Sequence, residues 1–403
     1  MSVSTALQVS LMPALKREPA PAAMAVLDGC GPRVCIGGAR GDDNLAIPIK
    51  PDANTLFGPR GACLLGKQGA LWISDTGHHR LLGWAQLPED DHVPADWVIG
   101  QPDFAREGRN AKSLPSGATL NVPTGICSLN EGIAVADAWN HRVLIWRSAP
   151  TDHNVPADMV LGQSDFSSVE SNRGGSASAQ SLFWPYGVQW DGSNLWVADS
   201  GNRRVLMWQG LPRDNGQPAD LILGQKTFVC RDENGGGEPT ASSMRWPHAI
   251  ARWGGRLCVT DAGNNRILVW DVAPTVDNAP ADWVLGQDDF RSVDHNQSLY
   301  WPSAATLHMP YGVTATGPWC IAADTANSRL IAWHSDDCRS GAAARALTGQ
   351  SEFNAKGDNA WRSPTRVSLS WPYGISAQSG LGIIADSGNN RVLLWPLARE
   401  LAT

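Results

Sequence analysis

The sequence predicts an all-β protein, a six-bladed β-propeller whose blades are four-stranded antiparallel sheets. Three observations predict it. The pattern Asp-x4-Arg-x3-Trp occurs six times, and successive Asp residues are 62, 62, 62, 63 and 62 positions apart. A second pattern, which ends in Gly-Gln-x-x-Phe, follows each of the first five copies, and a third, [Ser/Thr]-[Leu/Met]-x-x-Pro, precedes every copy. Gly and Pro are abundant (41 and 27 residues), as expected for short strands joined by many turns.

Each repeat contains four short segments that favour strands. In the third repeat these are 186–190 (YGVQW), 194–199 (NLWVAD), 204–208 (RVLMW) and 220–224 (DLILG). Tight turns follow the first and second segments, and a polar loop follows the third. Applied to every repeat, the pattern places the blade cores near 59–100, 123–162, 185–224, 247–286, 310–349 and 372–397.

The sixth repeat lacks its fourth strand, and the N-terminal region supplies a replacement. Residues 32–42 (PRVCIGGARGD) match residues 95–105 (ADWVIGQPDFA), which contain the fourth strand of the first repeat. We therefore expect residues 33–37 to complete the last blade and close the ring, leaving no free sheet edge there. The predicted organisation is a flexible extension over residues 1–28, followed by one propeller over residues 29–403.

Composition excludes several classes of function. The net charge of −7 gives no general attraction to nucleic acid or to an anionic membrane surface. No apolar run is long enough to span a membrane, and residues 1–28 lack the features of a secretory signal, so we expect a cytoplasmic protein. The eight Cys residues are scattered without metal-type spacing, which favours reduced thiols and predicts neither a metal site nor a cofactor.

The repeats resemble a known family. The segments VADSGNRRVLMW (197–208) and IADSGNNRVLLW (384–395), each following a Pro-x-Gly strand, resemble NHL repeats. The additional LGQxxF and LxxPxG motifs resemble a bacterial subgroup of NHL propellers. The resemblance covers residues 33–395 and implies the propeller fold. It implies less about function, because the family includes binding scaffolds, RNA-binding proteins and a few lyases and hydrolases.

Residues present in all six repeats are expected to hold the blades together. The repeated Asp ends the second strand and can accept backbone N–H bonds, the Arg returns on the third strand, and the Trp fills space between sheets. The turns also contain His78, His79 and His141, but other repeats carry Asn or Arg at equivalent positions, so metal binding is not predicted there. The Trp residues before proline are likewise expected to pack.

The two faces of the ring differ. Loops between the third and fourth strands hold eleven Asp, one Glu and two Arg, which favours a solvated acidic face. The opposite, top face carries connections of about 20 residues, the type of loop on which function is often found. Its charges nearly cancel, so the basic surface of an RNA-binding propeller is not expected. Trp139, Trp301 and Trp361 lie in these turns and loops outside the repeat pattern, which makes them candidates either for stacking on a ligand or anchoring a partner, or for packing the long loops down.

The residue after each repeated proline is the one variable position near the axis. These six positions should form a ring at the channel mouth: Arg60, Thr124, Tyr186, His248, Tyr311 and Tyr373. The ring offers a cation, an imidazole and three phenols, but no carboxylate. It lacks the oxygen ligands of a calcium-dependent hydrolase. It also lacks the two or three His of a zinc lyase, with only His308 near a neighbouring entry. The ring suits a small anion or polar ligand, with the Tyr residues as hydrogen-bond donors or simply as a cap on the channel.

The sequence therefore favours a non-catalytic binding scaffold over an enzyme. The top-face loops, the three Trp and the ring would hold a protein partner or a small polar or anionic ligand. The alternative is a lyase or hydrolase that resembles the peptidyl-hydroxyglycine lyase group. His248 would then be the acid/base or a metal ligand, and Arg60 and Tyr186 would stabilise an oxyanion.

Overall fold

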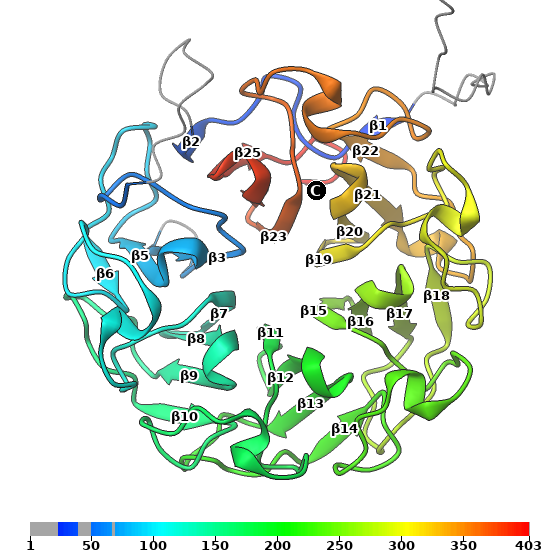
Figure 1. Ribbon diagram of the computed structural model, residues 1–403. Helices are drawn as coiled ribbons and strands as arrows, with labels where there is room; N and C mark the ends of the chain where they lie inside the picture. The colour runs from blue at the N-terminus through cyan, green and yellow to red at the C-terminus, as the bar shows by residue number, and fades with distance from the viewer. Residues whose placement is uncertain (1–22, 39–49, 67–68, 403) are drawn as a thin grey trace, which may run out of the picture.

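The computed structural model describes residues 23–38, 50–66 and 69–402, which form a ring of six blades around a central axis (Figure 1). The repeated strands are antiparallel within each blade and run outward from the axis in chain order, except that the sixth blade takes its outermost strand from the N-terminal region. The first three blades are β3 Gly61–Leu64, β4 Leu71–Asp75, β5 Arg80–Trp84 and β6 Trp97–Ile99; β7 Pro123–Leu129, β8 Gly132–Asp137, β9 Arg142–Trp146 and β10 Met159–Leu161; and β11 Pro185–Trp190, β12 Asn194–Asp199, β13 Arg204–Gln209 and β14 Leu221–Leu223.

The remaining blades complete the predicted six. They are β15 Pro247–Trp253, β16 Arg256–Asp261, β17 Arg266–Trp270 and β18 Trp283–Leu285; β19 Pro310–Thr316, β20 Trp319–Asp324, β21 Arg329–His334 and β22 Ala346–Thr348; and β23 Pro372–Gln378, β24 Leu381–Asp386 and β25 Arg391–Pro396 with β2 Val34–Gly37. The six-bladed, four-stranded architecture expected from the repeats is confirmed.

Short 3-10 turns are the helical elements of the described residues, and no helix there is long and apolar enough to cross a membrane. One set follows the second strand of each blade: η1 Thr76–His78, η3 Ala138–Asn140, η5 Ser200–Asn202, η7 Ala262–Asn264, η9 Thr325–Asn327 and η12 Ser387–Asn389. The others lie in longer connections: η2 Arg109–Lys112, η4 Ser171–Gly174, η6 Glu233–Gly236, η8 His295–Ser298, η10 Ser335–Asp337 and η11 Asp358–Trp361.

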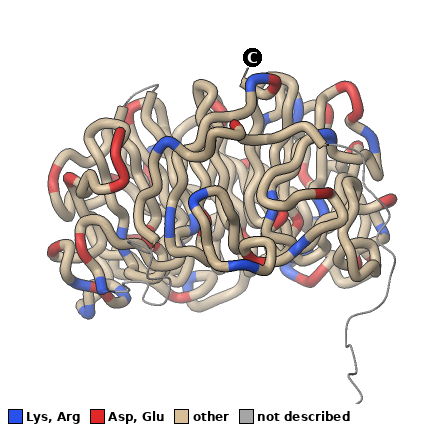
Figure 2. The backbone as a smooth tube through the Cα atoms, turned by 90° about the horizontal axis from the view of Figure 1, so that it is seen from above, with Lys and Arg blue, Asp and Glu red and all other residues tan. Residues whose placement is uncertain are grey.

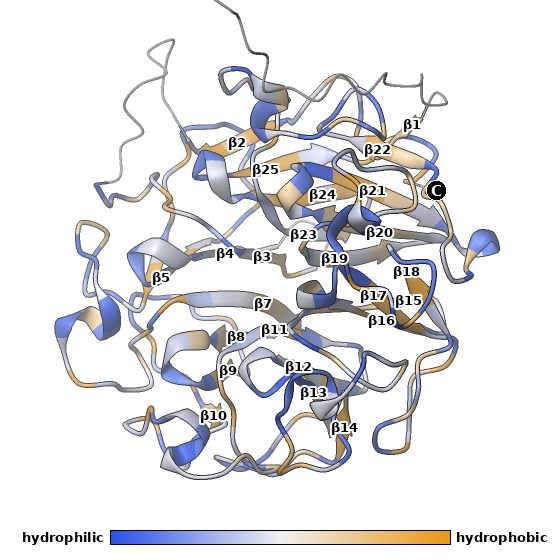
Figure 3. Cartoon of the chain, turned by 45° about the vertical axis from the view of Figure 1, so that its right-hand side comes forward, coloured by the Kyte–Doolittle hydropathy of each residue, from blue (hydrophilic) through white to orange (hydrophobic). Residues whose placement is uncertain are grey.

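Hydrophobic residues of the strands form the core between neighbouring blades, and Figure 3 shows hydrophilic residues mainly in the loops. The repeated Trp of the third strand is buried in every blade. Its indole N–H donates to a carbonyl of the following loop, as Trp208 does to Gln217 at 2.9 Å. Each indole therefore contributes buried apolar area and also fixes the loop that leads to the fourth strand.

The repeated Asp and Arg form a buried cross-link at the top of each blade. In the third blade, Asp199 accepts the backbone N–H of Phe183 at 2.7 Å and the Nε–H of Arg204 at 2.7 Å. The same guanidinium donates to the carbonyls of Ser178, Ser181 and Phe228. One ion pair thus joins the strands to both long connections, the structural role predicted for these residues.

The ring closes through the N-terminal region as expected. β2 pairs antiparallel with β25, with Val34 opposite Leu394, and completes the last blade (Figure 1). The indole of Trp395 donates to the carbonyl of Asp28, so the N-terminal segment also replaces the loop that the other blades place there.

A second N-terminal strand was not expected. β1 Met24–Ala25 pairs parallel with β22 and gives the fifth blade a fifth strand. Val26 and Leu27 are buried, so the predicted flexible extension over residues 1–28 is wrong for its last residues, while residues 1–22 lie outside the described part of the chain.

The position of β1 has a physical reason. In the other blades, a backbone N–H of the outermost strand donates to a loop side chain of the next blade, as Val160 does to Asn215 and Ile222 does to Asp277. The sixth blade takes its outer strand from the N-terminal region and has no such loop. β1 covers the corresponding edge of β22 instead, so that these backbone groups remain bonded.

Candidate functional site

Two cavities lie on the propeller axis. The first, which we term the vestibule, has a volume of about 670 Å³ and opens among the turns of the top face. The second, the channel cavity, has a volume of about 450 Å³ and lies among the innermost strands. Both are lined by the same five side chains, those of Arg60, Tyr186, His248, Tyr311 and Tyr373. These five residues, the partition, lie between the two cavities.

The partition side chains pack on one another. The imidazole of His248 stacks between Tyr186 and Tyr311, with ring centroids 4.8 and 4.4 Å away. Tyr311 contacts Tyr373 at 4.5 Å, and the Arg60 guanidinium lies 4.8 Å from the centroid of the Tyr373 ring. Five of the six predicted ring residues therefore meet across the axis.

A local irregularity aims these side chains at the axis. In the blades of Tyr186, Tyr311 and Tyr373, the register shifts between the proline and the following glycine, so the tyrosine between them is left out of the strand pairing. Such bulges redirect a side chain from the face of a sheet. The following glycine lets the backbone of the neighbouring blade approach closely, since a Cβ on Gly187 would lie 2.0 Å from the carbonyl oxygen of His248.

Arg60 is the one fixed charge of the partition. Among the described residues no carboxylate interacts with its guanidinium, whose charged or polar neighbours are the tyrosines. Burial raises the pKa values of the Tyr311 and Tyr373 phenols, which are neutral at pH 7. Burial, together with repulsion from Arg60, also lowers the pKa of His248 to about 4. Because the Nδ1 of His248 lies 3.0 Å from the Trp246 carbonyl, the neutral ring must carry its proton on Nδ1.

Thr124, the sixth predicted ring residue, lies elsewhere. It is fully buried, lines neither cavity, and donates its hydroxyl to the Tyr186 carbonyl at 2.9 Å. A hydroxyl on so short a side chain is satisfied by the neighbouring backbone and does not reach the axis. The second blade therefore contributes no side chain to the partition.

The vestibule walls are mainly aromatic. They include Phe57, Phe183, Trp184, Trp246 and Trp371. The three Trp residues are 43%, 41% and 41% exposed, so they pack as expected only in part and also leave surface open to the cavity. Sequence reasoning missed these wall residues. The signal that could have identified them is a Trp at three of the six equivalent positions before the repeated proline. Arg203 is the second cation of the lining, and none of the described lining residues is acidic.

The three loop tryptophans predicted as ligand contacts do not line either cavity. Trp139 and Trp361 are 49% and 70% exposed. Trp301 packs edge-on against Tyr300, at a centroid distance of 4.8 Å, and Lys356 lies over Tyr300. A role for these residues in contacting a partner stays a prediction, separate from the vestibule.

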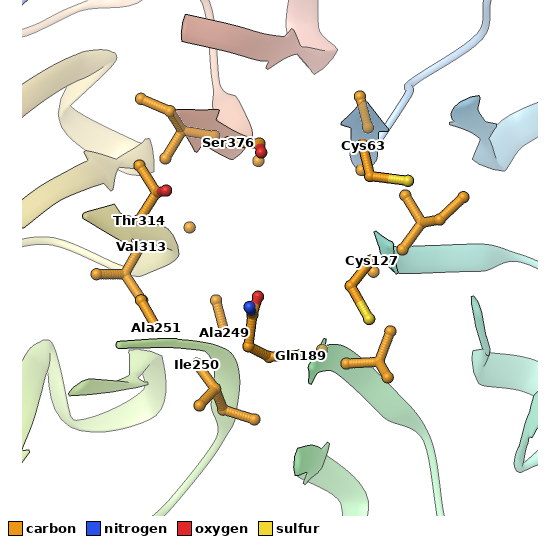
Figure 4. A pocket seen from close by; sticks show the side chains of 18 of the residues that line it. Cys63, Cys127, Gln189, Ala249, Ile250, Ala251, Val313, Thr314 and Ser376 are labelled. Carbon is orange, nitrogen blue, oxygen red and sulfur yellow. The ribbon is translucent and has the colours of Figure 1, made fainter. Parts of the chain in front are cut away.

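No described residues form a group of three or more His, Cys, Asp or Glu able to hold a metal ion. His308 stacks on His295 at 4.7 Å and does not line the cavities with His248. Cys63 and Cys127 line the channel cavity together with polar Gln189 and Thr314 (Figure 4). Burial raises the pKa of both thiols, that of Cys127 to about 12, which keeps them protonated and unreactive.

Lys and Arg alternate with Asp and Glu around the described chain, as the edge-on view in Figure 2 shows. The third-to-fourth-strand loops use part of their acidic side chains internally. Asp158, Asp220 and Asp282 each accept a backbone N–H from the preceding strand or its end. These carboxylates therefore shape the loops in addition to solvating them.

Comparisons with known proteins agree with the fold. Residues 244–270 match the model of the NHL repeat. A segment of 224 residues is 27% identical to NHL repeat-containing protein 2 of Gallus gallus, and the match covers 51% of this chain and 28% of that protein. This chain therefore corresponds to well under half of the length of that relative.

Solved structures with similar overall shape have little sequence identity to this chain. A gluconolactonase from Xanthomonas campestris is 11% identical, with a TM-score of 0.47, and the match covers 94% of this chain and 99% of that one. Virginiamycin B lyase from Staphylococcus aureus is 12% identical, with a TM-score of 0.42, covering 86% and 98%. The WD40 propeller domain of Doa1 is 7% identical, with a TM-score of 0.46, covering 88% and 100%.

Proposed function

We propose that this six-bladed β-propeller, which contains an NHL repeat, is a non-catalytic binding module that holds a small anionic ligand in the vestibule. The observation that carries the proposal is the charge of the cavity lining. Arg60 and Arg203 contribute guanidinium groups, and no described lining residue contributes a carboxylate. A cavity with unpaired guanidinium groups in a partly desolvated site attracts an anion, which supplies the missing charge.

The volume and the walls support a ligand of small-molecule size. A cavity of about 670 Å³ lies within the usual range for small-molecule sites. The exposed faces of Trp184, Trp246 and Trp371 offer apolar surface for a flat ligand body. The phenols and the imidazole below them can form hydrogen bonds without adding charge. A protein partner bound by the top-face loops stays a separate prediction.

The geometry favours binding over catalysis by His248. Its imidazole is wedged between two tyrosine rings, its Nδ1 is engaged by the Trp246 carbonyl, and burial lowers its pKa to about 4. A general base works best when its pKa is close to the working pH. A lyase or hydrolase acting through His248 would need this packed ring to take up a proton beside Arg60.

The proposal is tested by calorimetric titration with benzoate and with benzamide, which has a similar size but no charge. Wild-type protein should bind benzoate more tightly. Arg60→Met should weaken benzoate binding about 10-fold or more, the contribution of one hydrogen bond to a charged group, and leave benzamide unchanged. Arg147→Met, at an exposed arginine of an outer loop, is the matched control. Equal affinity of wild type for the two probes, or benzoate binding unaffected by Arg60→Met, would contradict the proposal.

A further inference from the structure

Neighbouring blades are joined at the top face by a repeated hydrogen bond. The residue before the repeated proline donates its backbone N–H to a side chain at the end of the strand two–three turn of the preceding blade. The five pairs are Val122 to His79, Trp184 to His141, Met309 to Asn265, Trp371 to Ser328 and Gly58 to Asn390, at 2.7–3.2 Å. We term this bond the blade latch.

The sixth junction lacks the latch. The equivalent turn residue is Arg203, whose backbone has the same left-handed conformation (φ 55°) as His141 (φ 54°) and Asn265 (φ 53°). A guanidinium has no lone pair with which to accept a hydrogen bond, so it cannot form the latch. The Trp246 N–H instead lies 3.3 Å from Asp261 of its own blade.

The backbone responds to the missing latch. Val122, Trp184, Met309 and Trp371 all have positive φ angles of 49–56°, a costly conformation for such side chains. Trp246 does not share it, since its φ is not positive. The junction between the third and fourth blades therefore lacks one hydrogen bond that the other five junctions have. Both residues at this junction, Arg203 and Trp246, line the vestibule.

Arg203 has donor capacity that the protein does not use. Its Nη1 donates to the Gly201 carbonyl at 2.7 Å and makes a long contact of 3.5 Å with the Arg231 carbonyl. Its Nε is buried and lacks a hydrogen-bond partner, and Arg203 takes part in no ion pair of the described residues. A guanidinium without a carboxylate partner, in the wall of a cavity without carboxylates, is a site for an anionic group.

We propose that Arg203 is a second anion-binding residue and that the ligand is a flat dicarboxylate, with one carboxylate for Arg60 and one for Arg203. This proposal rests on the proposed function and adds the ligand class. Arg60 lies in the partition, which forms the floor of the vestibule, and Arg203 lies in the wall formed by the turn η5. The two positive charges are matched by a ligand of net charge −2, and the aromatic walls by its flat apolar body.

The test compares terephthalate, which carries two carboxylates across one ring, with benzoate, which carries one. Calorimetric titration of wild-type protein should give an affinity for terephthalate about 10-fold higher or more, the effect of one further charge-assisted hydrogen bond. Arg203→Asn should remove this advantage, so that the variant binds terephthalate no more tightly than it binds benzoate. Arg60→Met should weaken binding of both probes.

Arg203→Asn is chosen because Asn stands at the same position in two other blades and can accept the Trp246 N–H. The variant should therefore restore the latch, and its melting temperature should rise above that of wild type as terephthalate binding falls. Arg203→Met, which removes the charge but adds no acceptor, should lose the same binding without the rise. A loss of binding caused by misfolding would lower the melting temperature and is thus distinguished.

The outcomes separate this inference from the proposed function. Wild-type protein that binds neither probe would overturn both. Wild-type protein that binds benzoate through Arg60, but binds terephthalate no better, would overturn only the role of Arg203 and the dicarboxylate class. Terephthalate binding that survives Arg203→Asn unchanged would also overturn the inference.

Discussion

The buried Asp–Arg cross-link gives the sharpest test of how the blades are held together. In the second blade, the Nε–H of Arg142 donates to Asp137 at 2.7 Å, and its Nη2 donates to the carbonyls of Ser116 and Thr119 at 3.0 and 2.8 Å. Its Nη1 donates to the Phe166 carbonyl. Both Arg142 and Asp137 are fully buried. We predict that Arg142→Met, which keeps most of the apolar stem, strongly destabilises the protein.

The magnitude follows from what the substitution leaves behind. An uncompensated buried carboxylate costs about 3–5 kcal/mol. Three carbonyls also lose a donor, at roughly 1 kcal/mol each, although Asp137 keeps its bonds to the Asn121 N–H and the Asn140 amide. Water entering beside the shorter side chain offsets part of this, so we expect a loss of about 4–7 kcal/mol. The double variant Asp137→Asn with Arg142→Met should recover about 2 kcal/mol of this, because it removes the unpaired charge.

Equilibrium urea unfolding, followed by tryptophan fluorescence, measures these free energies. The exposed Arg147→Met variant is the control and should change stability by less than about 0.5 kcal/mol. Hydrogen exchange adds a local readout, since the connections held by Arg142 should exchange faster than those of other blades. The reasoning is refuted if Arg142→Met costs less than about 1 kcal/mol, or if the double variant is no more stable than the single one.

Three further predictions concern acid stability, thiol reactivity and the added edge strand. Burial lowers the pKa of folded His248 to about 4, below the unfolded value near 6.5, so the unfolded state binds more protons and stability falls as pH drops from about 6.5 to 4. Urea unfolding at pH 7 and 4.5 should show about 2–3 kcal/mol of acid destabilisation from this residue, and the same pH dependence in His248→Gln would contradict it. Burial holds Cys63 and Cys127 protonated, so both should resist Ellman's reagent at pH 8 until the protein unfolds, while exposed Cys30 reacts. Rapid modification of Cys63 and Cys127 in the native protein would contradict this prediction. Thr348→Val removes the hydroxyl that accepts the Val26 and Leu27 amide hydrogens, so it should lower the free energy of unfolding by about 1 kcal/mol. Hydrogen exchange at these two amides should become faster. Exchange as slow as in wild type would show that Thr348 does not hold the segment.

The repeat pattern predicts most of the fold because every blade must satisfy the same contacts. The spacing of Asp, Arg and Trp fixes the second and third strands, and the match between residues 32–42 and 95–105 locates β2. β1 could not be predicted in this way. It is two residues long, belongs to no repeat, and is required only because the sixth blade lacks the loop that would cover β22.

The candidate site is predictable only in part, for a related reason. The position after the proline indicates five of the side chains that approach the axis, since five of the six residues at this position line both cavities. The pattern does not show how far each side chain reaches, so the burial of Thr124 and the exposure of Trp184 were missed. Arg203 is visible in the sequence as the turn residue without an acceptor group. Its consequence, the loss of the blade latch at one junction, could not be predicted because the latch is a contact between two repeats and does not appear within one.

The closure by β2 also dictates when the protein can finish folding during synthesis. Val34 pairs with Leu394, and these residues are 360 positions apart (394 − 34). At about 5–20 residues per second, a ribosome needs roughly 20–70 s to make the intervening chain. β2 is thus one of the first strands to leave the ribosome and among the last to be paired, and until then its edge is open to pairing with another chain.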